Sequence, residues 1–468
     1  MSNFYLPDNA DESFFPASKA DKINNNVEII KLVVDLKKNH QQATPEQQAK
    51  IATYVGWGGL ANDFFNEYGD KYAKQREELK SVVSKKQYND MKESSLTAYY
   101  TNPQVARAMW KKVVNDGLTH GNILDPAMGT GIFPMTMPKQ LRNKVDFYGV
   151  ELDEITGMIA KQLFPDFHIF IKGFQYVKFE EPNFDLVITN VPFGNIRILD
   201  DNNKPYLIHD YFLKRSLDLV RNYGEVAIIS SIGLMDKRER NILKEIKGYA
   251  DFLGGVRLPE NAFTKIAGTK VTTDVLFFMK DTEKTNKYYQ LLNTTAFSDV
   301  VKLAIDDRVF LNKYFSTHPD QILGRVKVSN FHNGTLTVVN KEDYLPKLDA
   351  ALANKKYMTS PKEFAQEENY GDKIVVKYSK QQDLPKKIQS LRKYEFGYLN
   401  DCVYYHYRDG IRKNAKITSV SYYIDESHHI VGSSDSKSRI NEWKEATNEG
   451  KDNIYDRFIS NTKTTTGN

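Results

Sequence analysis

Between about residues 121 and 280, short apolar runs alternate with stretches of helical spacing. The seven apolar runs are NILDPA, DFYGVEL, FHIFIKG, FDLVITN, EVAIISS, FLGGVRL and VTTDVLFFMK. Helical stretches lie among the first six, near residues 133–143, 154–164, 209–222 and 236–248. Strands that are apolar throughout belong in a parallel sheet with helices on both faces. We therefore predict an α/β fold with a Rossmann-like, mostly parallel seven-stranded sheet. No clear helix precedes the seventh strand, so we expect it to pair antiparallel at an edge.

The regions on either side of this pattern differ from it and from each other. Residues 1 to about 95 have mostly helical spacing, with a helix start signal at Thr44-Pro45-Glu46 and another helix opening at Asn102-Pro103. Beyond residue 282 the sequence is mixed and rich in Lys and Tyr. A chain of 468 residues usually forms two or three domains. We predict a helical N-terminal region (1–95), an α/β domain (96–282) and a mixed C-terminal domain (283–468).

The net positive charge lies in residues 283–468. Residues 283–468 hold 29 Lys and Arg against 24 Asp and Glu, and 29 − 24 accounts for the whole net charge of +5. Within residues 373–416, here called the basic segment, 11 basic side chains face 4 acidic ones, with tyrosines interleaved. The basic residues of interest are Lys386, Lys387, Arg392, Lys393, Arg412 and Lys413. This composition is that of a solvated surface or of a nucleic-acid contact that binds phosphates.

Several classes of protein are excluded by composition. Cys402 is the single cysteine, so no internal disulfide and no cysteine-based zinc site can form. The sequence contains no P-loop motif. No apolar run is long enough to span a membrane, and the first residues lack the apolar core of a signal peptide. We expect a cytoplasmic protein without a membrane segment and without a metal.

The first strand ends in a loop suited to a nucleoside. Asp125-Pro126-Ala127 is followed by Gly129 and Gly131, which allow a tight turn and close approach of a ligand. The next strand ends at Glu151, where an acidic side chain can accept hydrogen bonds from ribose hydroxyls. The third strand ends near Phe174, which could cover a purine. The alternatives are a packing loop with two surface acids, or a dinucleotide, although the spacing is not G-x-G-x-x-G.

The fourth strand ends in Asn190-Val191-Pro192-Phe193. An adenine amine is a poor nucleophile because its lone pair is delocalised, and two fixed acceptors for its N–H groups would make it more reactive. The Asn190 side-chain oxygen and the Val191 carbonyl oxygen can supply them, since Pro192 holds Val191 extended. Phe193 offers a ring for stacking. A base in a duplex must be flipped out to reach such a pocket. The alternative is a simple turn.

Three further features have ordinary structural explanations. His209-Asp210 could form an acid–base pair, but we favour a helix N-terminal cap, with Asp210 near the positive end of the dipole. Thr272 or Thr273 could border a target base, or could simply mark the entry to a strand. Trp57 in YVGWGGL is expected to be a packing anchor.

Taken together, the segments resemble the S-adenosylmethionine-dependent N6-adenine DNA methyltransferases. DPAMGTGIF resembles their D-P-A-x-G-x-G-x-F cofactor motif, NVPF resembles N-P-P-Y/F, and TAYYTNPQVARAM resembles the segment before the cofactor motif. The motif order is that of the gamma arrangement. YVGWGGL, GVELD, IHDYF and AGTKVTTDVLFF extend the resemblance to the methylase portion of large helicase–methylase proteins of phages and conjugative elements. The chain would be a relative that lacks the helicase.

The resemblance implies a class I methyltransferase fold and a role for each matching residue. Asp125, Ala127, Gly129 and Gly131 would line the methionine part of S-adenosylmethionine, which Thr101 and Pro103 would close; Glu151 would bind its ribose and Phe174 would cover its adenine. Asn190 and the Val191 carbonyl, with Pro192, would polarise the target amine, and Phe193 would stack on the base.

Two positions depart from the family pattern. Val191 replaces a proline but keeps the carbonyl, and Gly173 replaces an Asp that often precedes the aromatic, which predicts weaker cofactor binding. The implied function is site-specific methylation of adenine N6 in double-stranded DNA, as in restriction–modification systems. An RNA base, a protein glutamine amide, or a non-catalytic S-adenosylmethionine- or DNA-binding module of a mobile element remain alternatives. The recognition sequence and the oligomeric state are left open.

Overall fold

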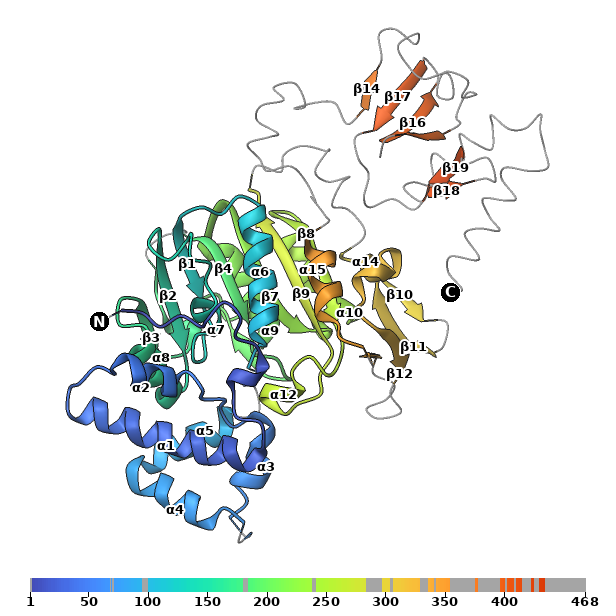
Figure 1. Cartoon of the computed structure of the whole chain (residues 1–468). Helices are drawn as coiled ribbons and strands as arrows, with labels where there is room; N and C mark the ends of the chain where they lie inside the picture. Colours follow the sequence, from blue (N-terminus) through green and yellow to red (C-terminus); the bar gives the residue numbers. More distant parts are fainter. Residues whose placement is uncertain are drawn as a thin grey trace.

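The computed structural model describes residues 2–353 with short gaps, and beyond them only six strand segments within residues 375–433. The gaps are residues 68, 70, 95–99, 180–183, 238–240, 283–296, 304–305, 329–335 and 341. A seven-stranded sheet of order β3-β2-β1-β4-β7-β9-β8 forms the centre (Figure 1). Its strands are β1 (Gly121–Asp125), β2 (Val145–Glu151), β3 (His168–Ile171), β4 (Phe184–Asn190), β7 (Val220–Ser231), β8 (Ala250–Leu258) and β9 (Thr273–Lys280). The predicted fold class is confirmed.

The direction of β9 agrees with the prediction, but its position does not. Neighbouring strands from β3 to β7 pair parallel, whereas β9 pairs antiparallel with both β7 and β8. The expected edge position was wrong, because β9 lies between β7 and β8 and leaves β8 at the edge. Residues 273–278 of β9 are all buried, so both faces of the strand are covered. An interior place in the sheet provides that cover.

Helices cover both faces of the sheet. On one face lie α6 (Pro103–Asn115) and α15 (Leu345–Ala353), which stand side by side in front of the sheet in Figure 1. The Asn102 side chain caps α6 by accepting from the Gln104 N–H, as Asn102-Pro103 predicted. On the other face α9 (Ile208–Leu219), α10 (Gly233–Asp236) and α11 (Asn241–Ile246) join a continuous apolar core.

One predicted helix is much shorter than expected. The sequence predicted a helix near residues 133–143, but α7 covers only Ile132–Met135 and turns follow it. Pro138 explains the difference, since a proline disfavours helical geometry in the residue before it. The other predicted helices are present: α8 (Glu154–Leu163), α9, and the pair α10 and α11 in place of one helix at 236–248.

The N-terminal region is helical, as predicted. Its helices are α1 (Lys19–Lys38), α2 (Pro45–Ile51), α3 (Ala61–Phe64), α4 (Ala73–Val82) and α5 (Lys85–Ser94). Thr44 forms a capping box with Gln47 at the start of α2. Trp57 is 3% exposed and stacks on Phe64 with ring centroids 4.2 Å apart, so it is a packing anchor as expected. The region shares one apolar core with α8.

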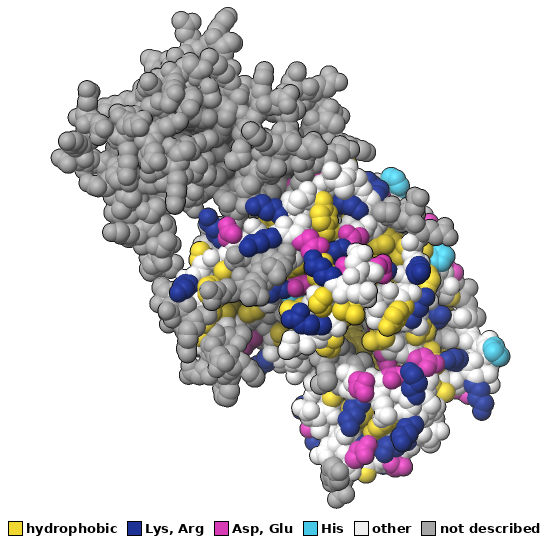
Figure 2. Space-filling model, turned by 180° about the vertical axis from the view of Figure 1, so that it is seen from behind, with side chains coloured by type: hydrophobic (Ala, Val, Ile, Leu, Met, Phe, Trp, Pro, Cys, Tyr) yellow, Lys and Arg dark blue, Asp and Glu magenta, His cyan; other side chains and the backbone are white. Residues whose placement is uncertain are grey.

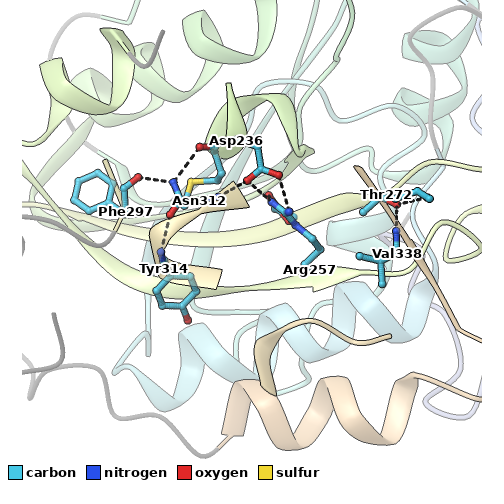
Figure 3. Close-up of polar contacts among 10 residues, drawn as sticks. Asp236, Arg257, Thr272, Phe297, Asn312, Tyr314 and Val338 are labelled. Atoms are coloured by element: carbon cyan, nitrogen blue, oxygen red, sulfur yellow. Dashed lines mark hydrogen bonds and ion pairs between the residues drawn. The ribbon is translucent and has the colours of Figure 1, made fainter. Parts of the chain in front are cut away.

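Residues 297–353 pack on the same sheet. They contain β10 (Val300–Leu303), β11 (Asp306–Asn312), α14 (Lys313–Thr317), β12 (Arg325–Val328), β13 (Leu336–Val339) and α15. Asn312 bonds through Nδ2 to the carbonyls of Met235 (3.0 Å) and Phe297 (2.8 Å), and its N–H donates to Asp236 at 2.8 Å (Figure 3). Phe315 and Val338 belong to the core of the sheet. The boundaries of the three-part division stay predictions.

A separate antiparallel sheet has the order β14-β17-β16-β15-β19-β18. Its strands are β14 (Val375–Lys377), β15 (Phe396–Leu399), β16 (Cys402–Tyr407), β17 (Gly410–Asn414), β18 (Tyr422–Ile424) and β19 (His429–Ser433). The side chains of the basic segment lie outside the described residues. On the face shown in Figure 2, basic and acidic side chains are intermixed over the described part of the molecule.

Candidate active site

The motif Asn190–Phe193 begins at the last residue of β4. The Val191 N–H donates to the Ile229 carbonyl of β7 at 3.0 Å, which fixes the peptide between Asn190 and Val191 against the sheet. Pro192 has no N–H to continue the ladder, and Gly194 follows with a φ of +149°. The chain therefore leaves the sheet at a defined point, at the carboxyl edge where ligands of such folds bind.

A hydrogen bond joins this motif to the segment before α6. Asn190 Nδ2 donates to Thr101 Oγ1 at 3.1 Å, and Thr101 is 3% exposed. Pro103 is the first residue of α6 and is also buried. The sequence placed these residues in two separate roles, 89 positions apart, and the structure brings them into contact. The bond fixes the orientation of the Asn190 amide.

The loop after β1 is a tight turn around two glycines. Gly129 and Gly131 have φ values of +55° and +92°, and the Ala127 N–H donates to Asp125 Oδ1 at 3.2 Å. A Cβ on Gly131 would overlap the ring of Phe164, so packing alone requires glycine there. A Cβ on Gly129 would meet no atom within 4 Å of the described protein. Gly129 is therefore the glycine that leaves open space in the loop.

Glu151, at the end of β2, bonds across to that loop. Its carboxylate accepts from the Gly129 N–H (2.9 Å) and from the Asp153 N–H (2.8 Å). Burial raises the pKa of Glu151 to about 7, with the charge of Asp153 adding to the effect. Burial likewise raises the pKa of Asp125 to about 7. Asp125 and Glu151 therefore form a pair of carboxyl groups at neighbouring strand ends.

The two aromatic rings that were expected to touch ligands are nearly buried. Phe174, in the short helix η3 (Phe174–Tyr176), is 2% exposed. Its ring packs against that of Phe212 of α9, with ring centroids 5.0 Å apart. The Arg215 guanidinium lies 4.8 Å from its ring centroid. Phe193 is 5% exposed. The stacking roles of both rings stay predictions.

Sequence reasoning overlooked two exposed side chains at the same strand ends. Leu152, directly after Glu151, is 71% exposed, and Tyr176, after β3, is 68% exposed. The available signal was their position one or two residues beyond the ends that the sequence did identify.

His209 and Asp210 lie in the first turn of α9, as expected, but Asp210 does not cap the helix. Asp210 instead pairs with Lys237. Burial lowers the pKa of His209 to about 4, so the imidazole is neutral at pH 7. Thr272 Oγ1 accepts from the Val338 N–H at 3.0 Å and lies 3.1 Å from Thr337 Oγ1, and Thr273 is fully buried (Figure 3). Thr272 therefore has a structural contact, and Thr273 is part of the buried interior.

The described residues show neither a cluster of metal ligands nor a helix that could span a membrane. No group of three or more His, Cys, Asp or Glu in that part of the chain is arranged to hold a metal ion. Among the helices that the structure describes, none has both the length and the apolar character needed to cross a bilayer.

Comparison with known proteins agrees with this fold and arrangement of motifs. The seven-stranded, mostly parallel sheet carries the motifs at its carboxyl edge. Residues 85–309 match the model of the family N-6 DNA Methylase. The predicted resemblance to N6-adenine DNA methyltransferases is thereby confirmed.

The chain is also similar to individual proteins. It is 30% identical over 193 residues to Defense against restriction protein B of Escherichia phage P1; the match covers 40% of this chain but 8% of that protein, so the chain spans only a small part of its length. Among solved structures it resembles the methyltransferase subunit of a type I restriction–modification system from Streptococcus thermophilus (15% identity, TM-score 0.35, 61% of this chain and 72% of that one). It also resembles a protein described as a class I S-adenosylmethionine-dependent methyltransferase from Listeria monocytogenes (16% identity, TM-score 0.36, 57% of this chain and 90% of that one).

Proposed function

We propose that this protein transfers a methyl group from S-adenosylmethionine to the N6 amine of an adenine flipped out of double-stranded DNA. The observation that carries the proposal is the hydrogen bond between Asn190 and Thr101. It joins the motif expected to hold the target amine to the segment expected to close the cofactor site. A methyl donor and its acceptor must meet at such a junction.

The residues at the neighbouring strand ends fit the cofactor. Glu151 is a carboxylate that already binds two N–H groups and can accept ribose hydroxyls in the same way. Asp125 is a buried carboxyl group at the end of β1, and its ionised form would favour a cationic ligand. The open space beside Gly129 leaves room for close approach. Thr101, Pro103, Ala127 and Gly131 would line the methionine part, and Phe174 the adenine.

When bound, S-adenosylmethionine supplies a methyl group on a positively charged sulfur. Asn190 and the Val191 carbonyl would accept the two N–H groups of adenine N6 and increase its nucleophilicity, while Pro192 keeps that carbonyl fixed. Held in this way, the amine nitrogen would receive the methyl group that S-adenosylmethionine supplies, and the electron pair of the carbon–sulfur bond would remain on the sulfur as a neutral thioether. The extra proton on the nitrogen leaves to water, so neutral, buried His209 is not needed as a base. Phe193 would border the flipped base.

We assign DNA recognition to the C-terminal domain and its basic segment. The whole net charge of +5 lies beyond residue 282, and basic side chains that contact phosphates supply most non-specific affinity for DNA. The family match favours DNA over an RNA base or a glutamine amide.

The test is the variant Asn190→Ala, assayed for transfer of labelled methyl groups to duplex DNA, to RNA and to a glutamine-containing peptide. Loss of one acceptor used in the transition state should cost roughly 3–4 kcal/mol, by analogy with the loss of one oxyanion-hole donor. Calorimetry should show cofactor binding nearly unchanged, and Asn202→Ala, on an exposed turn, serves as the matched control. Near wild-type transfer by Asn190→Ala would reduce the motif to a turn.

A further inference from the structure

The N-terminal region reaches the candidate cofactor site through a turn whose sequence had no assigned chemistry. This glycine turn is Tyr54–Leu60, YVGWGGL. Gly56 has a φ of +65°, and a Cβ built on it would overlap the ring of Tyr100. Glycine at 56 is therefore required twice, by its backbone conformation and by the aromatic ring packed against it.

Buried contacts hold the glycine turn in place. Asn26 of α1 is fully buried; its Nδ2 donates to the Gly56 carbonyl at 2.6 Å and its Oδ1 accepts from the Val55 N–H at 3.2 Å. Trp57 stacks on Phe64, as described above. A side-chain amide that bonds on both sides of one glycine gives that glycine little freedom to move away from Tyr100.

Tyr100 is the first of three consecutive residues, Tyr100–Asn102, here called the closing segment. Thr101 receives the hydrogen bond from Asn190. Asn102 Nδ2 donates to Glu12 Oε1 at 2.7 Å, so the N-terminal region contacts the closing segment at both of its ends. The candidate catalytic motif contacts it in the middle.

Tyr100 also lies near enough to the acidic residues at the end of β2 to be influenced by their charge. Its ring also meets Tyr54 edge to face, with centroids 6.3 Å apart. Burial raises the pKa of Tyr100 well above 10, and the nearby charges of Glu151 and Asp153 raise it further. The Tyr100 ring thus packs against the glycine turn through both Gly56 and Tyr54.

We propose that the N-terminal region is a positioning element of the cofactor site: Gly56 sets the ring of Tyr100 as a wall beside Glu151 and thereby holds Thr101 against Asn190. The inference rests on the proposed function, because the ligand of this wall is the nucleoside part of S-adenosylmethionine or of its demethylated product. Gly56 and Asn26 act through Tyr100 and do not touch the ligand.

The experiment measures calorimetric binding of the demethylated product, S-adenosylhomocysteine, to the full chain. Gly56→Ala should weaken it roughly tenfold, which corresponds to about 1.4 kcal/mol. Gly117→Ala is the matched control, because Gly117 also has a positive φ (+115°) but no atom within 4 Å of a built Cβ. It should bind as the wild type does.

A double-mutant cycle separates positioning from general destabilisation. In a Tyr100→Ala background the ring is gone, so adding Gly56→Ala should weaken binding no further. Wild-type affinity of Gly56→Ala, or additive effects of the two changes, would overturn the inference. If Gly56→Ala does not fold, Tyr100→Leu decides alone: unchanged affinity overturns the inference, and a roughly tenfold loss without a lower Tm than Gly117→Ala supports it. Failure of the wild type itself to bind would instead contradict the proposed function.

Discussion

Glu151 fixes the turn after β1 with the oxygen atoms that are also expected to bind ribose. Its bonds to the Gly129 and Asp153 N–H groups favour the ionised form, yet burial and the charge of Asp153 outweigh them and raise its pKa to about 7. Because the pKa of Glu151 is raised, ionisation of this carboxyl group in the folded protein lowers the stability of the fold. The site is thus built at some expense of stability, a common property of ligand sites.

This balance predicts how stability changes with pH. The folded pKa of Glu151, about 7, lies above its ordinary 4.5, so between those values the folded protein holds a proton that the unfolded chain has lost. The contribution of Glu151 to stability therefore falls as pH rises through this window. Glu151→Gln cannot titrate, so its Tm relative to wild type should increase from pH 5 to pH 8.

Thermal unfolding at several pH values checks this prediction. Glu154→Gln is a suitable control, because a hydrogen bond from Lys37 lowers the pKa of Glu154 and places its titration below the window. The Tm difference between Glu154→Gln and wild type should therefore stay constant from pH 5 to pH 8. A constant difference for Glu151→Gln as well would contradict the raised pKa.

At this scale the sequence predicted which residues end the strands, but not every contact they make. Asp125, Glu151 and Asn190 could be located because an apolar run stops at a polar residue. The burial of Phe174 and Phe193 could not be predicted, since it depends on how α9 packs across the sheet. The contact of Gly56 with Tyr100 could not be predicted either, because nothing in the residue spacing relates two positions 44 residues apart.

Among the elements, a buried network of ion pairs and hydrogen bonds joins β8, β9, α10 and β11. Arg257 of β8 is fully buried and bonds to Asp236 of α10 at 2.6 and 3.0 Å (Figure 3). It also bonds to Asp274 of β9 at 2.7 and 2.8 Å. Its guanidinium lies 4.3 Å from the ring centroid of Phe315. Asp236 also accepts from the Asn312 N–H of β11. Through Asp236, the Arg257 guanidinium therefore connects strands β8 and β9 to residues 297–353.

Removal of this guanidinium should be severe. Arg257→Met leaves two carboxylates facing each other in a dry interior, and breaking a buried ion pair in this way costs about 3–5 kcal/mol. Urea unfolding should show a lower midpoint. The triple variant Arg257→Met, Asp236→Asn, Asp274→Asn removes the stranded charges and should recover part of the loss. A triple variant no more stable than the single one would mean that packing, not charge, dominates.

The elements also show where sequence patterns stop being informative. Continuous apolar runs identified all seven strands of the sheet, because a doubly covered strand has no polar face. The same property hid the place of β9, since a run that is apolar throughout fits any interior position. Pro138 is present in the sequence, yet the spacing of the apolar residues around it is still that of a helix.

For the whole molecule, the central question is where the catalytic unit ends. Residues 297–353 contribute Phe315 and Val338 to the core on one face and the helix α15 on the other. Composition alone placed the change near residue 282, because the strand–helix alternation stops there. Composition indicates which type of secondary structure a segment forms, whereas packing determines which residues fold together. The boundaries that the two define need not fall at the same residue.

Truncation distinguishes the two positions. A chain ending at residue 353 should unfold cooperatively and bind S-adenosylhomocysteine as the full chain does, because the sheet, the closing segment and the arginine junction are all retained. A chain ending at residue 282 should fail to fold, since it exposes the apolar surface that residues 297–353 cover and removes Asn312 from Asp236. Differential scanning calorimetry and cofactor titration measure both outcomes.

The chain ending at residue 353 also tests the assignment of DNA recognition. It lacks the basic segment, so its affinity for duplex DNA should fall, and the slope of log affinity against log salt should flatten by about 0.9 for each phosphate that the protein no longer neutralises. Its cofactor affinity provides the internal control, because the strand-end site does not depend on the removed residues. DNA binding and methylation equal to those of the full chain at every salt concentration would place recognition within residues 1–353 and leave the basic segment as a solvated surface.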